Sequence, residues 1–381
     1  MKKSLIALAA LAATSAFAQS TVTIWGIADA AYANYSQGGV SRSFMTTSGN
    51  ASSQLGFKGT EDLGGGMSAS FWLEAQLNND TGAGGGFNST NTVFPGGTTG
   101  TNTSPTNNSN GGLFFNRRST IDLAGSFGAI RMGRDYTPTF WNHTVFDPFG
   151  TLGAGAGSNI TLAGKINTLT AARTNNGFSY LYGIAPNGGS HALGSTGVYA
   201  QVTYALAENL SNSATGAAGQ YQGARAGYAN GPLNVAVAYS ESNATIGTAT
   251  KYKETNIAGS YDLGVVNLMA MAGTNDVSTA AMSKQTYYRI AAKIPMGAGY
   301  IPVSFNTVSY NDAAKSGADQ FAIGYVYNLS KRTALYGTYS AISNKNGGTY
   351  TFLGGNGGGA SGLPATSANG TGYDIGLRTS F

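Results

Sequence analysis

Residue types able to perform acid–base or nucleophilic chemistry are scarce in this chain. It contains two histidines, His143 and His191, and no cysteine. Without cysteine there can be no thiolate nucleophile, no disulfide and no thiolate metal site. Neither histidine belongs to a His-Glu-x-x-His pattern, and no glycine run ends in the Gly-Lys-Ser/Thr of a phosphate-binding loop. The sequence therefore predicts no catalytic residue, no metal site and no cofactor.

The N-terminal residues predict export. Two lysines precede the apolar run Leu5–Ala13, and Ala16–Ala18 supplies a small-x-small cleavage pattern. The apolar run is too short to cross a bilayer, which takes about 20 residues. We predict that residues 1–18 are a signal peptide cleaved between Ala18 and Gln19, and that residues 19–381 form one domain.

The charge of the chain is low for a soluble protein. Charged residues make up 10% of the sequence, whereas soluble domains carry roughly a quarter. Removal of the first two lysines leaves 19 basic against 16 acidic residues, a net charge of +3. This balance and the lack of a basic cluster with interleaved aromatic residues argue against a nucleic-acid partner. A surface that contacts lipid explains the low charge, because lysine or arginine is costly there.

Short segments of alternating polarity follow one another after residue 19. In the last segment, Tyr373, Ile375, Leu377 and Phe381 alternate with small or polar residues. One face of such a strand suits lipid and the other suits water, which predicts an all-β transmembrane 16-stranded antiparallel β-barrel. A soluble β-sandwich also alternates, but its polar face would carry more lysine and glutamate. The predicted strands are Val22–Ser36, Ser53–Leu63, Met67–Asn78, Leu113–Ala124, Gly128–Asp135, Arg173–Gly183, Gly197–Leu206, Gln220–Ala229, Leu233–Ser242, Tyr252–Leu263, Val265–Thr274, Lys284–Ile294, Gly299–Asn311, Ala318–Leu329, Thr333–Ser343 and Gly372–Phe381.

The connections between these segments differ in length. Several are tight turns, such as Gly125–Phe127 and Asn230–Pro232. Others are long, and they include the segments Asn78–Gly112, Asp135–Ala172, Pro186–Thr196 and Asn344–Thr371. Outer-membrane barrels have short turns on the periplasmic rim and long loops on the extracellular rim, so we expect all the long connections to be extracellular.

Four blocks of sequence resemble the Gram-negative general porins, trimeric proteins, and most closely their β-proteobacterial branch. The blocks are Val22–Asp29, Ser53–Gly64, Phe115–Arg118 continuing into Phe127–Tyr136, and the aromatic strand that ends in Phe381. Any one of them is weakly specific, but their order and the signal peptide make the likeness strong. The resemblance implies an outer-membrane homotrimer in which each sixteen-stranded barrel has its own pore.

The resemblance also implies that the third extracellular loop folds inward and narrows the pore. Here that loop is Tyr136–Ala172. Family members often carry a Pro-Glu-Phe-Gly turn in it, and this chain has Asp147-Pro148-Phe149-Gly150 instead. Phe149 and Gly150 match the turn, and the nearest carboxylate is that of Asp147. We expect Tyr136, Phe149 and Gly150 to belong to the constriction loop, with Asp147 at the constriction.

Family members line the wall opposite that loop with basic residues. Arg134 and Arg173 match two of those positions, while Gln54 stands where an arginine is common. Within the fifth strand, however, strict alternation from Ile130 would turn Arg131 inward and Arg134 outward. A β-bulge would reconcile the alternation with the resemblance, and we favour Arg134 at the pore.

Alternation of side chains adds further candidates for the pore wall. It turns Lys58 and Arg118 inward, and likewise Arg289 and Lys293, although such charges could also be solvated at a rim. The bulky aromatic residues Trp25, Trp72, Tyr288 and Tyr325 are predicted to lie in the belts at the membrane–water interfaces.

The resemblance implies passive diffusion of small hydrophilic solutes and ions across the outer membrane. A basic wall facing an acidic loop would set the ion preference. Expected partners are lipopolysaccharide and other outer-membrane lipids, and the barrel-assembly machinery through Phe381. The first alternative is a substrate-specific channel for a sugar or an anion, with an aromatic stripe on the loop. A barrel enzyme that uses His143 is the second alternative, and it lacks an apparent nucleophile and orienting group.

Overall fold

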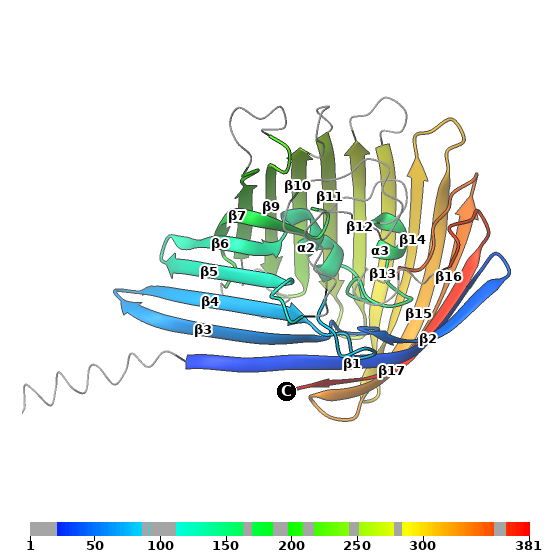
Figure 1. The fold of residues 1–381 in the computed structure, drawn as a ribbon, viewed down its shortest axis with the longest axis horizontal. Coiled ribbons are helices and arrows are strands. Elements are labelled where there is room, and N and C mark those ends of the chain that lie inside the picture. The colour runs from blue at the N-terminus through cyan, green and yellow to red at the C-terminus, as the bar shows by residue number, and fades with distance from the viewer. Residues whose placement is uncertain are drawn as a thin grey trace, which may run out of the picture.

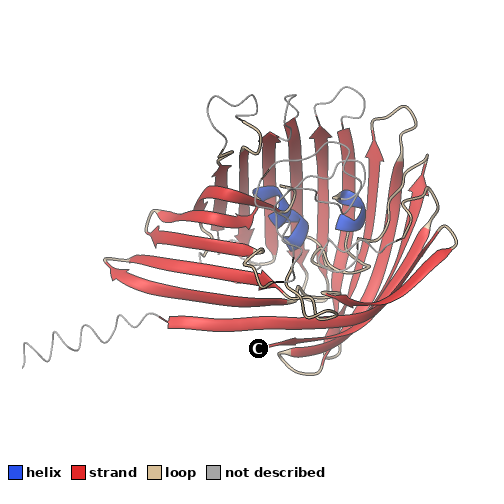
Figure 2. Ribbon diagram, in the orientation of Figure 1, coloured by secondary structure: helices blue, strands red, loops and turns tan. Residues whose placement is uncertain are grey.

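The computed structural model shows one continuous antiparallel sheet that curves around and closes on itself (Figures 1 and 2). The structure describes residues 21–85, 91, 112–162, 170–185, 197–208, 217–243, 251–277, 284–353 and 363–381. The predicted signal peptide and its cleavage site at Ala18 and Gln19 lie outside these residues. Closure comes from β1 (Thr21–Gln37), which pairs with β17 (Gly370–Ser380) on one side and with β2 (Val40–Thr47) and β3 (Gln54–Gly64) on the other.

Seventeen labelled strands therefore form a closed sixteen-stranded barrel, because β2 and β3 occupy one position beside β1. The sequence prediction omitted β2, whose residues do not alternate strictly in polarity. The remaining strands are β4 (Met67–Gln76), β5 (Arg118–Gly125), β6 (Gly128–Tyr136), β7 (Arg173–Tyr182), β8 (Gly197–Ala205), β9 (Tyr221–Asn230), β10 (Leu233–Asn243), β11 (Lys251–Asp262), β12 (Asn267–Val277), β13 (Lys284–Met296), β14 (Gly299–Tyr310), β15 (Gly317–Asn328) and β16 (Thr333–Lys345).

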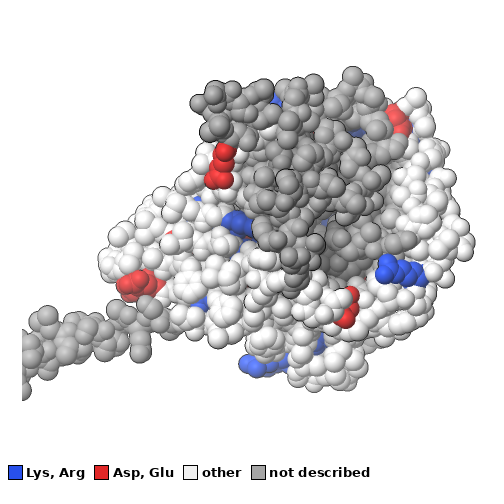
Figure 3. Space-filling model, viewed as in Figure 1, with Lys and Arg blue, Asp and Glu red and all other residues white. Residues whose placement is uncertain are grey.

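Polarity is inverted relative to a soluble protein. On β10, Val235, Val237 and Tyr239 are exposed on the outer surface, while Ala236 and Ser240 are buried on the inner face. Among the described residues in view in Figure 3, charged side chains are few. None of the helices in the described residues is long and apolar enough to cross a membrane. The alternation confirms the predicted division between a lipid-facing and a water-facing side.

The strand pairings also define the two rims of the barrel. The tight β5–β6 turn lies at one rim, and Leu181 near the end of β7 pairs with Ala129 beside that turn. The connection from β7 to β8, which contains Pro186–Thr196, therefore joins strand ends at the short-turn rim. Our prediction that this connection is extracellular was wrong. Its length is typical of an extracellular loop, but β7 runs toward the short turns and ends at their rim.

The connection between β6 and β7 enters the barrel instead of extending from its rim. It contains α2 (Pro138–Val145) and α3 (Ser158–Thr161), both of which lie inside the curve of the sheet (Figure 1). The helix α2 contacts β9, β10 and β11, and α3 contacts β14 and β15. This arrangement confirms the predicted inward-folded constriction loop.

Candidate functional site: the constriction of the barrel

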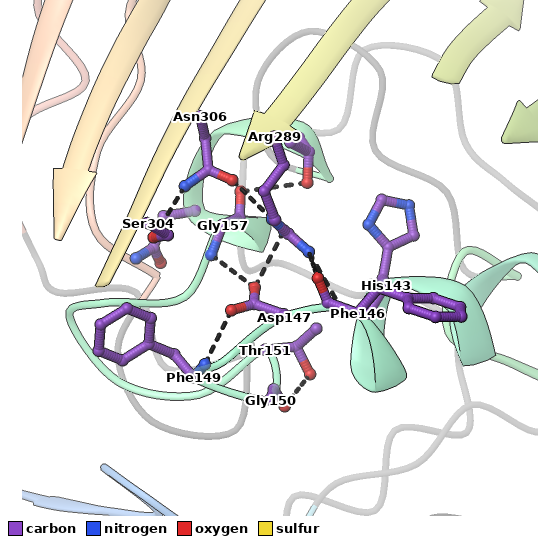
Figure 4. A network of polar contacts seen from close by, with 12 residues as sticks. His143, Phe146, Asp147, Phe149, Gly150, Thr151, Gly157, Arg289, Ser304 and Asn306 are labelled. Carbon is purple, nitrogen blue, oxygen red and sulfur yellow. Dashed lines mark hydrogen bonds and ion pairs between the residues drawn. The ribbon is translucent and has the colours of Figure 1, made fainter. Parts of the chain in front are cut away.

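The constriction loop is attached to the inner wall through its only acidic residue, Asp147. The Asp147 carboxylate lies 2.9 Å from the Arg289 guanidinium of β13, and neither side chain is more than 1% exposed. The same carboxylate accepts hydrogen bonds from the backbone N–H groups of Phe149 and Gly157 (Figure 4). Arg289 in turn donates to the Asn306 side chain at 2.7 Å. The acid predicted at the constriction thus faces the wall, and its pore role remains a prediction.

A second attachment holds α2 against the wall. The His143 Nε2 atom lies 2.7 Å from Glu254 Oε1 on β11, and the Tyr287 hydroxyl lies 3.2 Å from both atoms. Asn142 donates to Asn256 at 2.7 Å and accepts from Arg225 at 2.8 Å. These groups are all buried, so each depends on its partners to satisfy its polar atoms.

A third attachment fixes the far side of the loop. The backbone N–H of Ala154 donates to Asp374 of β17 at 2.6 Å, and Gln320 donates to the Ala154 carbonyl. With both flanks fixed, the segment Gly150–Leu152 is the part of the loop tip that stays partly exposed. The described part of this tip therefore presents a glycine, a threonine and a leucine to the water-filled space, while Asp147 faces the wall.

The opposite wall, on β3 to β5, carries stacked basic residues. The Lys58 ammonium lies 4.8 Å from the ring centroid of Trp72, and the Arg118 guanidinium lies 4.6 Å from it. Trp72 is 1% exposed and contacts Trp25 edge-to-face, so its predicted place in an outer aromatic belt was wrong. Gln54, also predicted here, is buried on the inner face of β3. The Trp72 ring therefore contacts two cations, and their positive charges add in one region of the wall.

A further basic cluster lies where β5, β6 and β7 meet the loop. Arg173 stacks on the Tyr136 ring at 4.3 Å and donates to its hydroxyl, which also accepts from Arg117. Arg117 pairs with Glu74 at 2.6 Å. Burial disfavours the Arg117 charge, but Tyr136 and Glu74 outweigh this effect and raise the pKa of Arg117. These contacts place the predicted residues Tyr136 and Arg173 side by side.

Arg131 and Arg134 lie in different surroundings in the structure. Arg131 lies on the inner face and pairs with Asp122 at 2.7 Å and with Asp135 at 2.6 Å. The predicted bulge exists, because the β6–β7 register shifts between Gly133 and Asp135. Arg134 is partly buried and donates to the Asn116 carbonyl and the Asn175 side chain. Its pore-lining role remains a prediction.

The two signs of charge differ in exposure over most of the inner face. Away from the short turns, the acidic residues that the described strands and the loop turn inward are at most 4% exposed, and they are Asp29, Glu74, Asp122, Asp135, Asp147, Glu254 and Asp374. At the turn ends of β3 and β11, Asp62 and Asp262 share the inward parity and are exposed. Several inward cations are partly exposed, among them Lys58, Lys293 and Arg378. Away from the turns, water and solutes inside the barrel therefore meet these positive side chains.

Comparison with known proteins identifies this architecture. The family model described as Gram-negative porin matches residues 4–347. The chain belongs to the Gram-negative porin family. Outer membrane porin protein 32 of Delftia acidovorans is 36% identical over 390 residues, with 100% of each chain covered. An outer membrane porin protein of Bordetella pertussis is 29% identical, covering 90% of this chain and 95% of that protein.

Among solved structures, this porin is similar to the anion-selective porin from Comamonas acidovorans. The TM-score is 0.75 at 32% identity, and the match covers 95% of this chain and 100% of the other. These relatives confirm the resemblance to the β-proteobacterial branch and the outer-membrane location. The protein is a diffusion channel of that membrane.

Sequence reasoning missed several residues that shape the site of this porin. The pairing of Arg289 with Asp147 was not predicted, although alternation correctly turned Arg289 inward. The roles of Glu254 and Asp374 as loop attachments were also missed. An acidic residue at an inward position in the middle of a strand or beside small residues is the signal that could have indicated them.

Proposed function

We propose that this porin is a general pathway for small hydrophilic solutes with a preference for anions. The observation that carries the proposal is that the acids on the loop and on the inner wall away from the turns are buried and hydrogen-bonded, while Lys58, Lys293 and Arg378 remain partly exposed. Rings of lysine or arginine favour anions in a pore. The field of a fixed charge extends about 8 Å at physiological salt, so these cations can select ions only where the pore is narrow.

We infer that the two signs of charge have different roles, and the contacts of the loop support this. Asp147 holds the loop in place through Arg289, and the basic residues Lys58, Arg118, Arg134 and Arg173 on the opposite wall provide the field. Gln54 supplies no charge at its position. The basic wall therefore faces a neutral loop tip and not an acidic one, and this arrangement strengthens the preference for anions.

The aromatic residues of the loop support a general pore over a substrate-specific one. Phe140, Trp141, Phe146 and Phe149 are at most 9% exposed. Phe149 lies against Gly155, and Phe140 stacks on Tyr136 at 5.0 Å. Side chains that pack within the loop offer no stripe along which a sugar ring could slide. His143, the residue considered for a barrel enzyme, is fully buried in the loop attachment, which supports a channel without catalytic activity.

Family membership also supports three partners. We infer that the protein assembles as a homotrimer, contacts lipopolysaccharide, and is recognised by the barrel-assembly machinery through Phe381. The position of Phe381 fits the last inference. Its backbone exchanges two hydrogen bonds of 3.0 Å with Gly26, and its ring covers Gly26 from outside at the end of the chain.

Single-channel recording of a charge-neutralised variant tests the proposed anion preference. We expect Lys58→Gln, Lys293→Gln and Arg378→Gln combined to lower the chloride-to-potassium permeability ratio and leave the channel open. Neutralising Lys331 and Arg332, which are exposed at the short-turn rim, is the matched control and should change the ratio little. An unchanged ratio in the triple variant would contradict the proposal.

A further inference from the structure

The indole ring of Trp25 lies on the inner face of the barrel, which lines the pore. Trp25 has the parity of Asp29, which is buried on the inner face, and not that of Ile24, which is 63% exposed on the lipid side. A Cβ on Gly56, its partner in register on β3, would lie 2.3 to 2.6 Å from three atoms of the indole. The ring therefore lies across a glycine, and it is partly exposed. Trp25 faces the lumen and not the lipid belt that was predicted for it.

A second indole ring supports the first. The ring centroids of Trp25 and Trp72 lie 5.3 Å apart in an edge-to-face arrangement. The Trp72 N–H donates to Glu74 at 3.0 Å, and the same carboxylate pairs with Arg117 at 2.6 Å. Trp72 is buried behind Trp25, so Trp25 presents the accessible aromatic surface of the pair.

A cation and a hydroxyl group lie next to the two rings. The Lys58 ammonium is 4.8 Å from the Trp72 centroid, and its side chain is partly exposed. Thr23 pairs in register with Lys58 and is exposed on the same face. An ammonium group and a hydroxyl group can both donate to a carboxylate oxygen. Because Trp25 and Lys58 contact the same Trp72 ring, one small solute can touch an aromatic surface and a cation together.

The acids nearest to Lys58 are engaged elsewhere. Each inward acid of β4, β5 and β6 pairs with an arginine. Asp29 of β1 is buried and accepts three backbone hydrogen bonds. Asp62 shares the inward parity of Lys58, but it accepts from the Gly64 backbone and lies four residues closer to the turn, about 13 Å along the strand. An anion in this part of the lumen therefore meets the Lys58 ammonium.

The two rings and Lys58 lie on the short-turn side of the constriction loop. Asp374, which anchors the loop, pairs in register with Ala33 of β1, and Trp25 is eight residues closer to the N-terminal end of that strand. That end lies beside the turn between β3 and β4. Because the short turns mark the periplasmic rim, a solute that has passed the loop meets Trp25 and Lys58 before it leaves the barrel.

We propose that Trp25 and Lys58 form a binding site for solutes that combine an aromatic ring with a carboxylate. The solute ring stacks on the indole of Trp25, and its carboxylate accepts from the Lys58 ammonium and the Thr23 hydroxyl. Stacking adds affinity beyond that of the charge alone, so the site favours such solutes over chloride and small aliphatic acids. The inference rests on the proposed preference for anions, because the solute must enter the pore as an anion.

Titration of the single-channel chloride current with potassium benzoate, at constant potassium chloride, tests the proposal on the full-length protein. Benzoate bound beside Lys58 neutralises its charge, so the current should fall and saturate. Half saturation by acetate, which has the carboxylate without the ring, should need a concentration about five- to ten-fold higher.

Variants of the aromatic residues assign the effect to the site. Trp25→Leu should raise the half-saturating benzoate concentration about three- to ten-fold and leave that of acetate unchanged. Trp25→Phe keeps an aromatic ring and should restore most of the affinity. Tyr300→Leu is the matched control, because Tyr300 is also partly exposed on the inner face and lies 5.6 Å from the ammonium of Lys293. The Tyr300 ring packs against Val326 and Tyr336, so this variant should keep the wild-type response to benzoate.

Three results would overturn the proposal. The first is a wild-type current that benzoate does not lower in a saturable way. The second is an equal loss of benzoate affinity in Trp25→Leu and Tyr300→Leu, which would show that any aromatic residue of the wall suffices. The third is an equal effect of benzamide, which has the ring without the charge and would indicate a site for neutral aromatic solutes.

The zero-current potential in a potassium chloride gradient separates this proposal from that of an anion-selective pore. Trp25→Leu removes no charge, so it should keep the wild-type potential. A wild-type potential of the sign set by potassium would contradict the anion preference. A potential of the sign set by chloride, together with no saturation by benzoate, would contradict the binding site alone.

A second variant keeps the test independent of the folding of Trp25→Leu. Gly56→Ala retains the indole but places a Cβ 2.3 Å from it, so the ring must leave its position on the wall. If Trp25→Leu does not assemble, Gly56→Ala should raise the half-saturating benzoate concentration about three-fold. Wild-type benzoate affinity in Gly56→Ala would then contradict the proposal.

Discussion

The carboxylate of Asp147 lies 2.9 Å from the guanidinium of Arg289, on the far side of the loop from the open channel. Asp147 is the only acidic residue between Tyr136 and Ala172. One arginine of the wall therefore decides that the constriction loop presents no negative charge to solutes. We propose that the ion preference of the pore depends on this pair as well as on the basic residues opposite.

Replacing Arg289 by methionine should release the Asp147 carboxylate. A buried acid that loses its partner costs about 3–5 kcal/mol, so the carboxylate is expected to turn toward water in the lumen. The chloride-to-potassium permeability ratio should fall in single-channel recordings. Adding Asp147→Asn to the same variant should restore the ratio, and a ratio unaffected by Arg289→Met would contradict this account of the pair.

Replacing Glu254 by alanine should loosen α2. His143 and Tyr287 would each lose a buried partner, at a cost of about 1–3 kcal/mol for each unsatisfied group. We expect larger fluctuations of the single-channel current and a lower unfolding temperature. Glu208→Gln, in an exposed loop position, is the control. Wild-type current noise in Glu254→Ala would show that other contacts suffice to hold the helix.

Replacing Gly133 by alanine should disturb the bulge that separates Arg131 from Arg134. Gly133 has φ +116°, and a Cβ there would lie 2.1 Å from the Ser119 carbonyl oxygen. Backbone strain of this kind costs about 1–3 kcal/mol. The unfolding temperature, followed by circular dichroism, should fall below that of Gly337→Ala, where a Cβ meets nothing within 4 Å. Equal unfolding temperatures would argue against a strained bulge.

Replacing Gly26 by leucine should hinder closure of the barrel. A Cβ on Gly26 would lie 2.4 Å from the Phe381 ring, so the terminal ring would have to leave its place across the β1–β17 seam. The fraction of folded protein, measured by heat-modifiable gel migration, should drop relative to Gly337→Leu. Similar yields of the two variants would mean that the covering of Gly26 is not needed for closure.

Much of the fold followed from alternation alone, because lipid on one side and water on the other impose a period of two on every strand. Alternation correctly turned Arg131 and Arg289 inward. It failed for β2, whose residues are mixed in polarity, and it did not place Trp72, since a large ring fits a lipid belt and a cation stack equally well.

The contacts of the constriction loop were beyond sequence reasoning. Asp147 appeared as a pore charge because a resemblance fixes position along the chain but not the direction of a side chain. Its direction depends on Arg289, which is 142 positions later in the sequence. Attachments such as Glu254 with His143 likewise join segments whose proximity exists only in the closed barrel.

The zero-current potential of the wild-type channel in a potassium chloride gradient tests the central claim most directly. Buried, hydrogen-bonded acids around the constriction and partly exposed cations on the inner wall predict a potential of the sign set by chloride permeation. A potential of the sign set by potassium would contradict the account, because it would mean that a negative group controls the neck of the pore.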